Sequence, residues 1–155
     1  MNTRKGIIAD FKKLEWGWEE EWVKKIQSKY KKGIKEGSQE FLVLETDENI
    51  VGEIHIFWKK QDTDEADGKK RAYLCAFRIH PDFQGQGLGR ALFQRAEKRV
   101  QEKSFTEITI GAYKHEPELQ DLYKRWGFTE FVKENIEEST EGKPIYILLL
   151  KKIVI

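Results

Sequence analysis

A glycine-rich segment in the middle of the chain constrains the fold more than any other feature. Its residues, 79–90, read Ile-His-Pro-Asp-Phe-Gln-Gly-Gln-Gly-Leu-Gly-Arg. An apolar run at 72–79 leads into it, and a helical apolar stripe at 88–100 leaves it. The first N–H groups of a helix have no internal partner, and the helix dipole adds positive potential there. The order strand, glycine loop, helix start therefore predicts a site for a phosphate group.

The glycine spacing separates this loop from two other phosphate loops. A P-loop ends in Gly-Lys-Ser/Thr, whereas Gly89 is followed by Arg-Ala. A dinucleotide fingerprint has the spacing Gly-x-Gly-x-x-Gly, whereas Gly85, Gly87 and Gly89 are evenly spaced. The pattern that remains is Gln-x-x-Gly-x-Gly, which begins at Gln84.

A second motif, Leu-Tyr-Lys-Arg-Trp-Gly-Phe at 122–128, lies downstream of the loop. Together the two motifs resemble the acetyl-CoA loop and the Leu-Tyr-x-x-x-Gly-Phe segment of the GNAT acetyltransferase superfamily. The order of elements also resembles that family: glycine loop, helix, strand, short helix and then this segment. The resemblance covers residues 40–131, and a compatible strand and helix precede them.

The resemblance implies a mixed α/β fold. The family has a strongly twisted mixed sheet of six to seven strands, with helices on both faces and a central strand pair that splays apart, here residues 72–79 and 105–112. Periodicity predicts further strands at 5–11, 40–46, 49–59, 128–134 and 145–154 and helices at 16–36, 88–100 and 116–126. The first helix would place Trp18, Trp22 and Ile26 on one face. We expect one domain over residues 1–155, since the chain shows no repeat or linker.

In the family, acetyl-CoA enters the opening between the splayed strands. The resemblance implies that the backbone of Phe77 and Ile79 pairs with the pantetheine arm like an added strand. It also implies that the loop amides hold the pyrophosphate; these belong to Gln84, Gly85, Gln86, Gly87, Leu88, Gly89 and Arg90. The Arg90 side chain either adds a charge-assisted contact to a phosphate or is a solvated first-turn arginine.

The family moves the acetyl group directly, without an acyl-enzyme. Tyr123 matches the tyrosine that protonates the CoA sulfur, a role suited to a group with a pKa of about 10. The alternative is a packed tyrosine. Many relatives carry a glutamate on the strand before the loop, but the matching region here offers Tyr73. Glu53 and His55 share one face of the neighbouring strand and are candidates for the general base; the alternative is a polar, half-exposed strand face. His115 is a weaker candidate.

One departure concerns the pantetheine contacts. Many relatives have Asn seven residues before the tyrosine and Ala four before it, whereas this chain has Glu116 and Leu119. Two hypotheses follow. The first is an acetyl-CoA-dependent N-acetyltransferase for a primary amine, and the alternative is a non-catalytic acyl-CoA-binding module or sensor.

The composition of the chain limits the kinds of partner that we expect it to bind. A net charge of +1 predicts neither a nucleic-acid nor a membrane partner. One cysteine and three histidines without ligand spacing predict no metal site. No signal or membrane-spanning run is visible, so we expect a cytoplasmic protein, and family members are often homodimers. Acidic clusters at 19–21 and 62–67 favour a cationic acceptor; the alternative is a solvated surface.

Overall fold

A seven-stranded mixed sheet is the frame of the molecule, with strand order β1-β2-β3-β4-β5-β7-β6. The computed structural model describes residues 1–17, 20–139 and 141–155. The strands are β1 (Asn2–Lys5), β2 (Gln39–Glu45), β3 (Ile50–Phe57), β4 (Arg71–Ile79), β5 (Glu107–Tyr113), β6 (Glu130–Glu138) and β7 (Pro144–Ile153). The helices are α1 (Glu20–Glu36), α2 (Leu88–Glu102) and α3 (Pro117–Arg125), with 3₁₀ turns η1 (Ile8–Lys13) and η2 (Pro81–Phe83). The expected α/β fold is confirmed.

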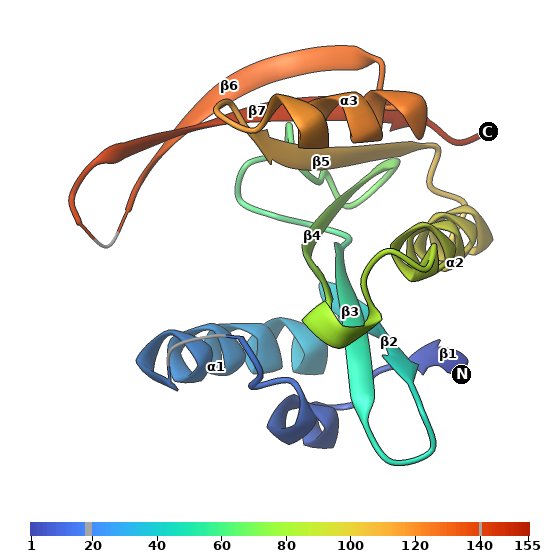
Figure 1. Ribbon diagram of the computed structural model, residues 1–155. Helices are drawn as coiled ribbons and strands as arrows, with labels where there is room; N and C mark the ends of the chain where they lie inside the picture. Colours follow the sequence, from blue (N-terminus) through green and yellow to red (C-terminus); the bar gives the residue numbers. More distant parts are fainter. Residues whose placement is uncertain (18–19, 140) are drawn as a thin grey trace.

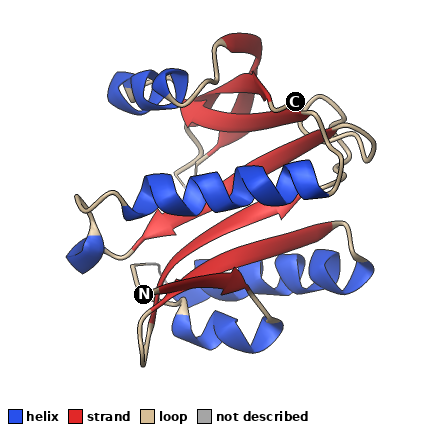
Figure 2. Ribbon diagram, turned by 90° about the vertical axis from the view of Figure 1, so that its right-hand side faces the viewer, coloured by secondary structure: helices blue, strands red, loops and turns tan. Residues whose placement is uncertain are grey.

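Helices cover both faces of the sheet. Figure 2 shows α2 crossing one face, with α1 and η1 on the opposite one. Strand β2 shows how a nearly continuous apolar run contributes side chains to the hydrophobic cores on both faces of the sheet. Leu42 joins the core under α2, whereas Phe41 and Val43 join the core under α1 and η1. The sheet is therefore buried on both sides over β2 and β3.

The central strands β4 and β5 pair only briefly. Their parallel register runs from Arg71 opposite Glu107 to Leu74 opposite Ile110, and no further. Beyond that point the two strands diverge, and Figure 1 shows β5 leaving with β6, β7 and α3 while β4 stays with β3. The expected splayed pair is present, and it leaves the β5-facing edge of the second half of β4 without a strand partner.

A β-bulge in β4 decides which side chains face which helix. Cys75 lies opposite His55 and Arg78 lies opposite Glu53, so two residues of β4 face Ile54 alone. Ala76, inside the bulge, has a φ of 48°. The extra residue shifts the alternation of side chains. Phe77 and Ile79 therefore pack on the α2 side, like Leu74, and Arg78 turns toward the α1 side.

The predicted strand at 5–11 is wrong. Strand β1 ends at Lys5 and η1 begins at Ile8, because the Asp10 carboxylate turns the chain back. It accepts a hydrogen bond from the Ile7 amide at 2.8 Å and pairs with Arg4 through both oxygens. The predicted first helix is described from Glu20 onward. Trp18 and Glu19 lie outside the described residues, as do the side chains of Glu20 and Trp22.

Candidate functional site

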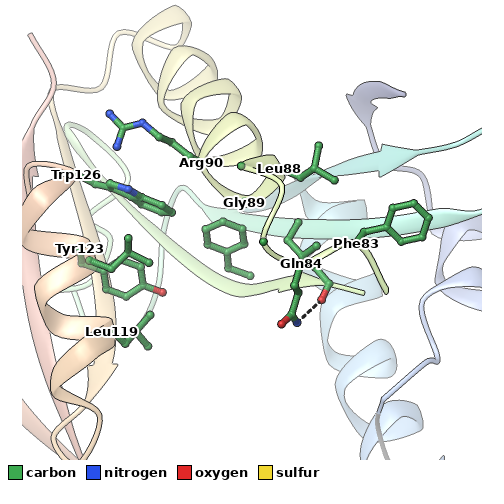
Figure 3. Close-up of a pocket in the computed structure, with 13 residues that line it drawn as sticks. Phe83, Gln84, Leu88, Gly89, Arg90, Leu119, Tyr123 and Trp126 are labelled. Carbon is green, nitrogen blue, oxygen red and sulfur yellow. Dashed lines mark hydrogen bonds between the residues drawn. The ribbon is translucent and has the colours of Figure 1, made fainter. Parts of the chain in front are cut away.

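A pocket of about 390 Å³ opens where β4, the start of α2 and α3 meet. Figure 3 shows the pocket with the glycine loop on the right and Tyr123 on the opposite wall, on the left. The lining is apolar on the strand and helix walls and backbone-rich at the loop. It comprises Phe77, Ile79, Phe83, Gln84, Gly85, Gly87, Leu88, Gly89, Arg90, Leu119, Leu122, Tyr123 and Trp126.

The glycine loop presents unpaired amides to this pocket. Gly85 and Gly87 have φ values of 79° and 77°, in the left-handed region that favours glycine. Gly87 is the N-cap of α2 and offers no capping side chain. The first helical hydrogen bond comes from Ala91 to the Gly87 carbonyl, at 3.2 Å, so the amides of residues 88–90 precede it. These amides and the helix dipole suit an anion.

The side chain of Gln84 holds the loop to the end of β4. Its Nε2 donates to the Ile79 carbonyl oxygen at 2.9 Å (Figure 3). His80 caps the short turn η2 by accepting from the Asp82 amide at 3.1 Å. The Gln84 side chain thus positions the loop, and the Ile79 carbonyl keeps one lone pair for another donor.

Tyr123 forms the opposite wall from α3. Its ring packs against Trp126 and Phe128, with centroids 5.9 and 6.0 Å apart. Burial, and to a lesser extent the charge of Glu116, raises the pKa of Tyr123 to about 12. Its hydroxyl points into the pocket in Figure 3. The side chain is therefore a protonated donor at neutral pH.

Most residues predicted for the site come together here. The pocket contains Phe77, Ile79, Tyr123 and every predicted loop residue except Gln86. Four lining residues were missed, namely Phe83, Leu119, Leu122 and Trp126. Leu119, Leu122 and Trp126 follow helical spacing around Tyr123, and that periodicity is the sequence signal for them.

The two base candidates lie elsewhere. Glu53 and His55 are buried on the α1 face, so the alternative interpretation of a half-exposed strand face is wrong. His55 Nε2 lies 2.7 Å from Glu53 Oε1, and its Nδ1 lies 2.9 Å from Gln39 Nε2. An amide nitrogen only donates, so Nδ1 accepts and Nε2 carries the proton toward Glu53. The His55 ring stacks on Phe41, and the Tyr30 ring packs against it at a tilt of 43°.

Arg78 joins this buried pair to the segment before α1. Its guanidinium pairs with the Glu53 carboxylate and donates to the carbonyls of Leu14 and Trp16, at 2.7 and 2.8 Å. It also lies 4.2 Å from the centre of the Trp16 ring. Because the β4 bulge turns Arg78 toward the α1 side, its guanidinium group holds residues 14–16 against the sheet.

The carboxylates of the acidic loop have partners within the protein, and the role of this loop toward a cationic acceptor stays a prediction. Asp62 and Asp64 pair with Lys133 on β6 at 2.8 and 3.0 Å. Glu65 pairs with Lys60, and Asp67 accepts hydrogen bonds from the backbone amides of residues 69–71. The loop therefore folds back on the protein through these contacts.

Two further observations concern the described residues only. None of their helices combines the length and apolar character needed to cross a membrane. Nor do they hold a group of three or more His, Cys, Asp or Glu side chains arranged for a metal ion.

Comparison with known proteins points to one family. A family model described as the acetyltransferase (GNAT) family matches residues 7–128. The uncharacterized N-acetyltransferase ycf52 of Gracilaria tenuistipitata var. liui is 42% identical over 50 residues, which cover 32% of this chain and 26% of that protein. The alignment thus spans about a quarter of that relative's length.

Solved structures agree over nearly the whole chain. The ribosomal-protein-alanine N-acetyltransferase of Brucella melitensis is similar with a TM-score of 0.76 and 17% identity, covering 99% of both chains. The structure of yncA from Salmonella typhimurium with its cofactor acetyl-CoA is similar with a TM-score of 0.72 and 17% identity, covering 100% of this chain and 94% of that one. At these identities the likeness establishes the fold.

Proposed function

The chain belongs to the acetyltransferase (GNAT) family, and we propose that it is an N-acetyltransferase acting as one domain of residues 1–155. It moves an acetyl group from acetyl-CoA to a primary amine of a small-molecule or peptide acceptor. One observation carries this proposal: the unpaired amides of the glycine loop and the Tyr123 hydroxyl line the same pocket from opposite sides.

The pocket suits the chemistry of acetyl-CoA. A pyrophosphate is an anion, and the amides of residues 88–90 together with the α2 dipole favour one. Arg90 adds a positive charge to the same wall. The apolar wall of Phe77, Leu119 and Leu122 suits a pantetheine chain, and the unpaired edge of β4 beyond Leu74 offers backbone groups to its amides. The similar yncA structure contains acetyl-CoA as its cofactor.

In this reaction we assign the role of proton donor to Tyr123. The acceptor nitrogen forms a bond to the thioester carbon as the carbon–sulfur bond breaks, and the departing thiolate takes the Tyr123 hydroxyl proton. A buried, protonated hydroxyl aimed into the pocket supports this role.

The acceptor amine must also lose a proton. We propose the hydrogen-bonded pair of Glu53 and His55, the candidates from the sequence, as the base. Because the pair is buried on the face opposite the pocket, this role requires a water-mediated path for the proton. Glu53→Gln and His55→Gln test this assignment. We expect each to lower kcat at neutral pH. An unchanged kcat in a folded variant removes the pair from the mechanism.

A thiol-release assay with a panel of primary amines tests the activity. Turnover of acetyl-CoA that depends on an added amine supports the transferase. The alternative is a non-catalytic acyl-CoA-binding module, and it is favoured by Glu116 and Leu119 standing where many relatives have Asn and Ala. Tight acetyl-CoA binding in calorimetry without turnover of any amine selects that alternative.

A further inference from the structure

Lys60 places its ammonium group in a cage on the sheet face opposite the pocket. Its Nζ lies 5.0 Å from the centre of the Phe57 ring, 4.6 Å from that of Tyr73 and 3.2 Å from Glu65 Oε1. The two rings are 6.3 Å apart and tilted by 48°. Ring faces within about 6 Å of a cation attract it, and the carboxylate neutralises it. This cage has the chemistry of a binding site for a primary ammonium.

The walls of the cage are held by contacts that do not involve Lys60. Phe57 and Tyr73 are paired in register on β3 and β4, and the Phe57 ring also packs against Tyr30 at 5.6 Å. The backbone carbonyl of Glu65 accepts a 2.6 Å hydrogen bond from Thr109 on β5, and its amide donates to the Asp62 carbonyl. We therefore expect the walls to keep their positions without the lysine.

The Lys60 ammonium, by contrast, is exchangeable. Its side chain is 30% exposed, whereas that of Glu65 is 15% exposed. A partly exposed ion pair on a flexible four-carbon stem contributes little stability. Another ammonium of the same chemistry can therefore replace it at low cost.

The position of the cage relates it to the opening between the central strands. Tyr73 directly precedes Leu74, the last residue of β4 that pairs with β5. Leu74 packs under α2, so Tyr73 faces the opposite side. A strand rises about 3.3 Å per residue, so the bulge at Ala76 lies about 10 Å further along β4. The cage thus flanks the closed end of the opening.

We propose that the cage of Phe57, Tyr73 and Glu65 binds a second ammonium group of the acceptor, and that Lys60 is a placeholder which the acceptor displaces. This inference rests on the proposed acetylation of amines. It defines the acceptor class as an amine that carries a second positive charge.

Calorimetry on the whole protein tests the cage with a seven-carbon α,ω-diamine and with the seven-carbon monoamine of the same chain length. Lys60→Met removes the ammonium group from the cage, and we expect this variant to bind the diamine about tenfold more tightly while monoamine binding changes less. Adding Glu65→Gln to Lys60→Met should abolish the gain. Lys59→Met, the exposed neighbour, removes the same charge outside the cage and should leave both affinities unchanged.

Equal diamine affinity in the wild type and Lys60→Met overturns the proposal, as does an equal gain for both ligands or for Lys59→Met. Thermal unfolding confirms that each variant is folded. The readout is independent of catalysis. Failure of thiol release with intact diamine binding counts against the transferase and not against the cage, whereas amine-dependent turnover without a Lys60 effect counts against the cage alone.

Discussion

The burial of Tyr123 sets its chemistry. Its ring is enclosed by Trp126 and Phe128, and burial raises its pKa to about 12, above the usual value of 10. A raised pKa keeps the hydroxyl protonated, so a proton remains available for a leaving thiolate throughout the neutral range. We therefore expect no descending limb from Tyr123 in the pH profile of kcat between pH 7 and 10.

Tyr123→Phe keeps the ring packing and removes this proton. We expect kcat to fall by about 10²–10⁴-fold when chemistry is rate-limiting, while the Kd for acetyl-CoA from calorimetry stays close to wild type. Tyr146→Phe, at a more exposed position on β7, is the matched control and should retain activity. A wild-type kcat in Tyr123→Phe would exclude Tyr123 as the general acid.

Gly87 tests the loop as the anion site. A Cβ at Gly87 meets no protein atom within 4 Å, so the methyl group of Gly87→Ala would occupy the open space that a pyrophosphate needs. We expect at least a tenfold loss of acetyl-CoA affinity in calorimetry.

Gly37→Ala is the control for backbone strain. Gly37 has a φ of 80° and equally open surroundings, but it lies at the end of α1. Both substitutions put alanine in the left-handed region and should cost about 1–2 kcal/mol of stability. Only Gly87→Ala should lose affinity; a parallel loss in Gly37→Ala would attribute the effect to strain.

At the scale of the element, β4 shows where sequence reasoning stops. Its bounds and the helix start at Leu88 are local properties of apolar runs and glycine spacing, and both were predictable. The bulge was not, because an apolar run such as residues 72–79 contains no signal for one extra residue. The pairing of Arg78 with Glu53 depends on that shift in alternation, as does the turn of Phe77 into the pocket.

The bulge is strained at Ala76, whose φ of 48° suits glycine better. Ala76→Gly should therefore leave the free energy of unfolding unchanged or slightly higher. Ala76→Val places a β-branched side chain in the left-handed region and should lower it by about 1–2 kcal/mol or more. Urea unfolding measures both variants. Equal stability of the valine and glycine variants would show that the strain is relieved in solution.

For the whole molecule, the two sequence motifs were sufficient to predict the fold class, because they adjoin the central strands β4 and β5. Strands β2 to β5 and β7 lie close to their predicted ranges, since each is a largely apolar run bounded by turn residues, whereas β6 is mostly polar and continues to Glu138, beyond the predicted end at residue 134. The first strand was wrong because Asp10, which is distant from both motifs, folds the chain back through its contact with Arg4. The ion pairs of the acidic loop were not predicted for a similar reason, because Asp62 and its partner Lys133 are 71 residues apart in the sequence.

The ion pairs of the buried and half-buried carboxylates predict how stability depends on pH. Hydrogen bonding to Arg4 holds the pKa of Asp10 below its usual value, despite the opposing effect of burial. Burial alone would raise the pKa of Glu40, but its pairing with Arg99 on α2 outweighs this and lowers it. Lys133 likewise lowers the pKa of Asp62. These carboxylates bind protons less tightly in the folded state than in the unfolded state, so their contribution is present above the unfolded pKa and is lost as the pH falls through the folded one.

We therefore expect the free energy of unfolding in urea to be nearly constant from pH 7 to 5 and to decline below about pH 4, where unfolded carboxyl groups begin to bind protons. Asp10→Asn removes one of these groups. It should be less stable than the wild type at pH 7, because Arg4 and the Ile7 amide lose their charged acceptor, and the difference should shrink as the pH falls below 4. Asp47→Asn, in the exposed turn between β2 and β3, is the control and should follow the wild-type curve. A constant difference between Asp10→Asn and wild type across this range would mean that the Asp10 contact stabilises the fold by packing and not by charge.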